Sequence, residues 1–255
     1  MTKIDPFSLT TVPIEQFANG KMLGAATSFV WKRGAKHYLI TNWHVVTGCN
    51  AQTRELLNQV RPDSIRAHFN SRRMDYGKVR REIRIRDEDH KPLWCVHPIR
   101  KNKSDIVAIP LEIDDDTEIG LYPINSMKSE ADLAVTIGMD VFILGYPFGN
   151  IPPGFPVWKR GSVASEPDLV NLDRGFLLVD TASRPGMSGA PVIRRSWGAH
   201  TLAGGGTSSN GTPQSKLVGV YSGRLHTNDT SDAQLGMVWP ASDIEDIVSL
   251  QARDD

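Results

Sequence analysis

The feature that most limits the fold is a succession of short apolar segments separated by turn residues. Most of these segments are rich in β-branched or aromatic residues and recur roughly every ten to twenty residues, bounded by Gly, Pro, Asn or Asp. The segments are ATSFVW, HYLIT, IRAHF, REIRIR, DIVAIPL, VFILGY, FLLVDT, PVIRR, KLVGVYS and LGMVW. This rhythm is typical of an all-β barrel or sandwich.

The end of the chain departs from this rhythm and favours a helix. In SDIEDIVSLQA, Ser242 is followed three residues later by Glu245, which is the spacing of a capping box. Apolar residues then recur at helical spacing, at Ile244, Ile247, Val248 and Leu250. We therefore expect a C-terminal helix that packs against the β-structure.

The chain has 255 residues, which is long enough for one large domain or two small ones with separate cores. The acidic segment EIDDDTE, residues 112–118, is typical of an exposed connection between two halves. A junction just after it gives an N-terminal extension over 1–20, a first β-barrel over 21–118 and a second β-barrel over 119–240. Residues 241–255 then form the C-terminal helix and tail.

The segment TASRPGMSGAPV places Ser188 in a tight turn with small neighbours. Gly, Pro and Ser dominate ordinary β-turns, so a purely structural turn accounts for the pattern. Alternatively, Ser188 is a nucleophile whose flanking N–H groups bind a reacting oxygen. Because a hydroxyl is a weak nucleophile at neutral pH, the second interpretation requires a histidine base and an acid that orients it.

Two residues meet these requirements. His44, in YLITNWHVV, ends a predicted strand, and Asp105, in NKSDIVAIPL, heads another. A half-buried carboxylate there can accept a hydrogen bond from one imidazole nitrogen and leave the other nitrogen free as a base. Taken alone, each residue favours a structural role. The order His, Asp, Ser, with gaps of 61 and 83 residues, suits two six-stranded barrels that meet at a cleft.

Five segments in this order resemble the chymotrypsin-like serine peptidases, and they are most similar to the bacterial HtrA-type branch. They are GAATSFVWKRGAKHYLITNWHVV, SDIVAIPL, FILGYPFG, KRGSVAS and TASRPGMSGAPV. The resemblance implies an all-β fold of two six-stranded antiparallel β-barrels with the active site in the cleft between them. It also implies that His44 is the general base, Asp105 its orienting acid and Ser188 the nucleophile.

The same resemblance implies an oxyanion hole formed by the N–H groups of Gly186 and Ser188, with Met187 between them. Met187 occupies the position where trypsin-like zymogens carry an aspartate that pairs with a newly cut N-terminal amine. We therefore expect no activation by that route. We expect the resemblance to HtrA-type peptidases to end before a PDZ module, because the sequence after the predicted C-terminal helix is too short for one.

The resemblance also places six residues around the substrate. They are Ala182, Ser183, Tyr221, Ser222, Gly223 and Arg224. Ala182 occupies the position of the acid at the base of the pocket in trypsin-like enzymes. A cationic substrate side chain would lose its hydration there without gaining a partner, so we expect no preference for Lys or Arg.

Composition limits the partners and the compartment. Lys plus Arg and Asp plus Glu both number 29, so charge does not favour nucleic acid or a membrane surface. No apolar run of signal-peptide or membrane-span length occurs, so we predict a cytoplasmic protein in which Cys49 and Cys95 are reduced thiols. Without a CxxC motif or a His/Cys cluster, we expect no metal site and no cofactor.

These observations together predict a serine endopeptidase that cleaves protein or peptide substrates through an acyl-enzyme. The alternatives are a catalytically silent peptidase fold that binds a peptide at an edge strand, and a serine esterase. An open site in the cytoplasm would be hazardous, so we also predict a regulatory protein partner. Its target would be the loop SRPGMSG, whose glycines allow the peptide preceding Met187 to flip.

Overall fold

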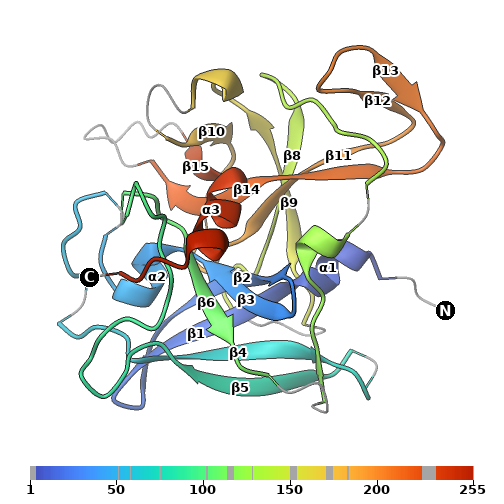
Figure 1. The fold of residues 1–255 in the computed structure, drawn as a ribbon. Helices are drawn as coiled ribbons and strands as arrows, with labels where there is room; N and C mark the ends of the chain where they lie inside the picture. Colours follow the sequence, from blue (N-terminus) through green and yellow to red (C-terminus); the bar gives the residue numbers. More distant parts are fainter. Residues whose placement is uncertain are drawn as a thin grey trace.

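The computed structural model describes residues 4–50, 52–57, 59–74, 76–101, 103–113, 118–127, 129–149, 154–170, 175–182, 184–225 and 234–254. Strands dominate its regular structure, as the sequence predicts. They form two main sheets, one from the blue to green part of the chain and one from the yellow to red part, and the two lie against each other (Figure 1).

The first half of the chain forms a seven-stranded antiparallel sheet with the order β5-β4-β1-β2-β3-β6, and β7 pairs with β4. Its strands are β1 (Thr11–Ala18), β2 (Lys21–Arg33), β3 (Lys36–Thr41), β4 (Ser64–Ser71), β5 (Lys78–Arg84), β6 (Val107–Leu111) and β7 (Ile119–Gly120). Asn19 and Gly20 join β1 to β2, and both have positive φ angles, of 49° and 76°. These are the backbone angles of a type I′ hairpin turn, for which Asn-Gly is the preferred sequence.

The second half forms a closed barrel with the order β10-β15-β14-β11-β8-β9. Its strands are β8 (Asp140–Gly145), β9 (Val157–Val163), β10 (Leu177–Asp180), β11 (Pro191–Ser196), β14 (Gln214–Arg224) and β15 (Leu235–Pro240). Alternate side chains of these strands point inward, so Val141, Ile143 and Val192 are buried in one core. The short strands β12 (Ala199–Thr201) and β13 (Thr207–Ser209) form a separate hairpin beside the barrel.

The closed barrel agrees with the predicted architecture, whereas a second closed barrel is not shown. In the described residues, β5 and β6 stand at the two ends of the first sheet without a ladder between them. The connecting segment lies there instead, because Cys95 pairs with Ala108 and the Leu93 N–H donates to the Ile85 carbonyl at 2.9 Å. The first half is therefore an open half-barrel.

The limits of the two halves also differ from the expected ones. Residues 11–18, expected within an N-terminal extension, form β1 in the middle of the first sheet, paired with both β2 and β4. Residues 119–120, expected in the second barrel, form β7 and pair with β4 of the first sheet. Pairing partners distant in the sequence decide both assignments.

Three short α-helices accompany the strands: α1 (Pro6–Thr10), α2 (Trp43–Thr47) and α3 (Ser242–Leu250). Two 3-10 helices, η1 (Ile124–Ser126) and η2 (Pro167–Leu169), lie in connections. The C-terminal helix is confirmed, but its predicted capping box is wrong. Ser242 is already helical, and the preceding Ala241 makes no side-chain cap hydrogen bond. The helix start is held instead by buried Asp243, whose carboxylate accepts from Ser104 Oγ at 2.9 Å and Arg100 Nη1 at 3.2 Å.

A shared core joins the two halves. Phe29 and Ile40 of the first sheet pack in one buried cluster with Leu144 and Val220 of the barrel and with Ile247 of α3. The contact is apolar and buried, so the two sheets hold a fixed relation to each other. None of the helices described is long and apolar enough to cross a membrane.

Candidate active site

His44 lies where the chain leaves the first sheet. Strand β3 ends at Thr41, Asn42 remains extended with φ −87° and ψ 152°, and α2 begins at Trp43. His44 is therefore in the first turn of a short helix and not at the end of the strand itself. Gly48 ends this helix in the left-handed conformation, with its N–H donating to the His44 carbonyl at 3.0 Å.

Asp105 holds His44 by two hydrogen bonds. Its Oδ2 lies 2.7 Å from His44 Nδ1, and its Oδ1 accepts from the His44 backbone N–H at 2.9 Å. The Asp105 side chain is only 1% exposed, whereas that of His44 is 17% exposed. With Nδ1–H donating to the carboxylate, the lone pair of Nε2 is left for another partner.

Two further residues hold Asp105, one at its carboxyl group and one at its backbone carbonyl. Ser222 Oγ donates to Asp105 Oδ2, and Asn42 Nδ2 donates to the Asp105 backbone carbonyl at 2.7 Å. Ser222, predicted to contact substrate, therefore also links the second half of the chain to Asp105. The Asp105 side chain is thus held in one position, from which it orients the imidazole.

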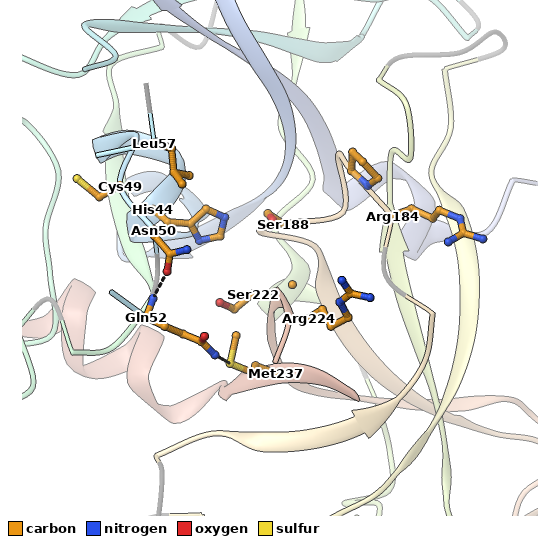
Figure 2. A pocket seen from close by; sticks show the side chains of 12 residues that line it. His44, Cys49, Asn50, Gln52, Leu57, Arg184, Ser188, Ser222, Arg224 and Met237 are labelled. Carbon is orange, nitrogen blue, oxygen red and sulfur yellow. Dashed lines mark hydrogen bonds between the residues drawn. The ribbon is translucent and has the colours of Figure 1, made fainter. Parts of the chain in front are cut away.

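Ser188 faces His44 across a cleft. Figure 2 shows the His44 ring directed toward the Ser188 side chain, with Ser222 and Arg224 on the other side of the cleft. Ser188 comes from the loop before β11, and it lies between Gly186, with φ +91°, and Gly189, with φ +83°. These angles favour glycine, which explains the spacing of the motif.

The backbone around Ser188 leaves two N–H groups without an acceptor in the part of the chain that the structure describes, those of Gly186 and Ser188. The Met187 N–H differs, because it donates to the Arg184 carbonyl at 3.3 Å. The amide of Met187, which lies between the two N–H groups of the predicted oxyanion hole, is therefore already engaged. Its side chain is buried in the barrel core, close enough that a Cβ on Gly145 would lie 2.7 Å from its sulfur.

The cleft has a volume of about 410 Å³. Its lining brings together residues from both halves: His44, Cys49, Asn50, Gln52 and Leu57, then Arg184, Pro185, Ser188, Ser222, Gly223, Arg224 and Met237. Ser222, Gly223 and Arg224, which are predicted to contact substrate, line this cleft. The contributions of Asn50, Gln52, Leu57 and Met237 were not predicted, because no local motif marks them.

Two of the predicted substrate-binding residues, Ala182 and Tyr221, do not line this cleft. Tyr221 is 1% exposed and packs inside the barrel, where its ring would contact a Cβ on Gly236 at 2.4 Å. Ala182 is half-buried and does not line the cleft. Ser183 lies outside the described residues.

A second hollow of about 320 Å³ adjoins the cleft and shares Gln52, Ser222 and Met237 with it. Its other lining residues are Arg54, Lys103, Asp105, Phe176 and Trp239. It therefore combines two cationic side chains with aromatic walls beside the buried carboxylate. No group of His, Cys, Asp or Glu suited to a metal ion occurs among the described residues.

A closed antiparallel barrel packed on a second β-sheet, with a His–Asp pair from the sheet and a glycine-flanked serine from the barrel, defines the chymotrypsin-like class of fold. The chain belongs to the trypsin-like peptidases, since the family of the trypsin-like peptidase domain matches residues 26–199. The predicted resemblance to this family is confirmed. No curated protein matches the sequence significantly.

One solved structure supports the fold at low sequence identity, and a second is reported as similar. A serine endoprotease from Yersinia pestis is 14% identical with a TM-score of 0.52, and the match covers 98% of this chain and 67% of that one. The Rv3671c protease from M. tuberculosis, in its active form, is 18% identical with a TM-score of 0.48, covering 95% of this chain and 80% of that one. The similarity to the Yersinia pestis structure shows the fold alone.

Proposed function

We propose that the chain is a serine endopeptidase that cleaves peptide bonds by way of an acyl-enzyme on Ser188. The observation that carries the proposal is the bonding of His44 Nδ1 to Asp105 while the ring faces Ser188 in the cleft. His44 Nε2 would take the Ser188 proton as Oγ attacks the substrate carbonyl carbon. Asp105 would stabilise the imidazolium that results, since its Oδ2 lies 2.7 Å from Nδ1.

The N–H groups of Gly186 and Ser188 would bind the oxyanion of the tetrahedral intermediate. Removal of one such donor typically costs about a hundred- to a thousandfold in turnover. The proton on His44 then passes to the leaving amine, and the peptide bond breaks. Water, deprotonated by His44, attacks the acyl-enzyme and releases Ser188 and the second product with all protons returned.

The extended peptide substrate would lie along the end of β14, at residues 222–224, which line the cleft. We propose this edge because an extended peptide can pair with a strand whose backbone is exposed. The substrate class is then a protein or peptide. Arg224 and Gly223 would meet residues close to the scissile bond.

Labelling with a fluorophosphonate tests the proposal, because the probe reacts only with an activated serine. We expect labelling of the wild-type chain and none of Ser188→Ala, with a loss of several orders of magnitude for His44→Ala. Absence of wild-type labelling would favour the peptide-binding module. Labelling together with cleavage of esters but not of matched peptides would favour the esterase. Labelling that accelerates when lysate fractions are added would support the predicted regulatory partner.

A further inference from the structure

Thr27 lies in β2, just beyond the point where the pairing with β3 ends. The pairing of β3 with β2 ends at Ile40, opposite Phe29. Beyond this pair the chain turns away to form α2, the helix that carries His44. Among the described residues, Thr27 therefore has no backbone partner in β3, and only the Thr41 side chain reaches it, with Oγ1 donating to the Thr27 carbonyl at 2.9 Å. The Ser188 loop lies there instead, with the Thr27 N–H donating to the Ser188 carbonyl at 2.8 Å. The same turn that presents His44 thus makes room for Ser188.

The Thr27 hydroxyl forms hydrogen bonds with two residues of the second half of the chain. Its Oγ1 donates to the Gly186 carbonyl at 2.7 Å and accepts from the Tyr146 N–H at 3.0 Å. Thr27 is fully buried, so both bonds are shielded from water. Neither is a contact between neighbours in the sequence, because Thr27 and Gly186 are 159 residues apart.

Thr27 completes a set of bonds to every carbonyl of the loop from Pro185 to Ser188. Pro185 accepts from the Phe148 N–H at 3.1 Å, and Met187 accepts from the Ala190 N–H at 3.1 Å. Thr27 binds the remaining two carbonyls. Because each peptide unit is planar and trans, binding a carbonyl also fixes the direction of the N–H in the same unit.

The Gly186 carbonyl belongs to the peptide unit that precedes Met187, the unit whose rotation would rearrange the loop. With φ +91°, Gly186 offers little resistance of its own to that rotation, since glycine adopts many backbone conformations. Two contacts oppose it, the bond from Thr27 Oγ1 to the Gly186 carbonyl at 2.7 Å and the longer one from the Met187 N–H to the Arg184 carbonyl at 3.3 Å.

We propose that Thr27 is a positioning residue, whose hydroxyl holds the Ser188 loop in the arrangement that leaves the Gly186 and Ser188 N–H groups free to bind an oxyanion. This role rests on the proposed peptidase function and deepens it. It assigns control of the oxyanion hole to the first half of the chain, although the hole itself belongs to the second half. The activity would then depend on how the two halves pack against each other, because that packing brings Thr27 to the Ser188 loop.

Replacement of Thr27 by Val tests the role, because Val keeps the shape and removes the hydroxyl. The Gly186 carbonyl and the Tyr146 N–H would both lose a buried partner. We expect kcat and the rate of fluorophosphonate labelling to fall about 10- to 100-fold, with KM nearly unchanged, since the oxyanion forms only after substrate binds. Thr27→Ser keeps the hydroxyl and should restore most of the rate.

Ser28→Ala is the matched control. Ser28 is the next residue of β2, equally buried, and its Oγ donates to the Val12 carbonyl at 2.8 Å, away from the loop. This variant loses one buried hydrogen bond within the first sheet, so its stability should fall while kcat stays within about twofold of wild type. If Thr27 had a purely structural role, Thr27→Val would behave like Ser28→Ala, with lower stability and a kcat close to that of wild type.

Different results would contradict the role of Thr27 and the proposed peptidase function. Equal labelling of wild type and of folded Thr27→Val would overturn the role of Thr27 alone. No labelling of wild type would overturn the peptidase proposal and with it this one. If Thr27→Val does not fold, Thr27→Ala and Thr27→Ser form a second pair that differs only in the hydroxyl. Equal kcat in that pair would equally contradict the inference.

Discussion

Both carboxylate oxygens of Asp105 accept a hydrogen bond from His44, Oδ2 from the ring at 2.7 Å and Oδ1 from the backbone at 2.9 Å. The imidazole is thereby fixed in orientation and in tautomer. Ser222 donates to the same Oδ2, so the carboxylate is surrounded by donors.

Replacement of Asp105 by Asn should nearly abolish activity without loss of the fold. An amide has one oxygen that accepts and one NH₂ group that only donates, so in either orientation the NH₂ group would oppose an N–H of His44. If the NH₂ group faces the ring, the proton moves to Nε2, the nitrogen that should accept from Ser188. We expect kcat to fall about 10⁴-fold. A change of only a few-fold would mean that another acid, such as Asp89, orients the base.

The motif residues were predictable from the sequence, because each lies in a short segment whose own pattern marks it. Ser188 has glycines on both sides, His44 follows a strand and Asp105 precedes one. The helix after residue 241 was predictable from its apolar spacing, although its cap was not. Asp243 turns inward to Arg100 and Ser104, which lie far away in the sequence.

Residues whose role depends on distant partners could not be predicted. ATSFVW indicates only a strand, and Thr27 gains its role from a loop 159 residues away. Tyr221 was assigned to the substrate pocket, but side chains alternate along a strand, so neighbouring Ser222 faces the cleft while Tyr221 faces the core. The pairing of β14 with β15 also shifts register between Tyr221 and Arg224, and such a shift has no sequence signal of its own.

Replacement of Gly189 by Ala should disrupt the site through crowding. A Cβ there would lie 2.1 Å from the Thr27 carbonyl oxygen and 2.4 Å from Thr41 Oγ1. We expect the labelling rate to fall at least about a hundredfold, because the loop must move away from Thr27. Gly198→Ala is the control, since Gly198 has a similar φ of +74° but open space around it. It should cost about 1 kcal/mol of stability and keep its activity. Equal labelling of the two variants would contradict the crowding argument.

Lys78 should make the protein more stable as the pH rises from about 8, the pKa of Lys78 in the folded protein, to 10.5, its ordinary pKa. Burial lowers the pKa of Lys78 from 10.5 to about 8, although Nζ donates to Asn70 Oδ1 at 2.7 Å and lies 5.6 Å from the Phe155 ring centroid. Between these two pKa values the unfolded chain binds more protons than the folded one, so the free energy of unfolding increases with pH.

The comparison with Lys78→Met isolates this effect. Burial raises the pKa of the Cys95 thiol, which makes the folded state lose stability at high pH, but it does so equally in both proteins. Urea unfolding at pH 7.5 and pH 9.5 should therefore show a larger gain for wild type than for Lys78→Met. Exposed Lys91 provides the control, because Lys91→Met should follow wild type. Parallel pH curves for wild type and Lys78→Met would refute the assignment.

From the cationic lining of the hollow beside the cleft, we expect the protein to prefer substrates with acidic residues near the scissile bond. Arg54 and Lys103 line it, and its one carboxylate, Asp105, is already bonded to His44 and Ser222. Arg54 stacks over the Trp43 ring at 4.5 Å, which holds its guanidinium in place. A carboxylate of the substrate that enters this hollow would meet a cationic lining.

Matched peptides that carry Glu or Gln at successive positions around a single cleavage site measure this preference. We expect one position at which Glu raises kcat/KM about fivefold over Gln, a gain of about 1 kcal/mol, because the hollow is partly open to solvent. Lys103→Gln should reduce that ratio toward one without changing cleavage of the Gln peptide, whereas Lys36→Gln, an exposed lysine outside both hollows, should leave it unchanged. Added salt should reduce the ratio in wild type, since screening weakens an exposed ion pair. A cleavage profile rich in Lys or Arg, or a Glu/Gln ratio unaffected by Lys103→Gln, would show that this hollow does not bind the substrate.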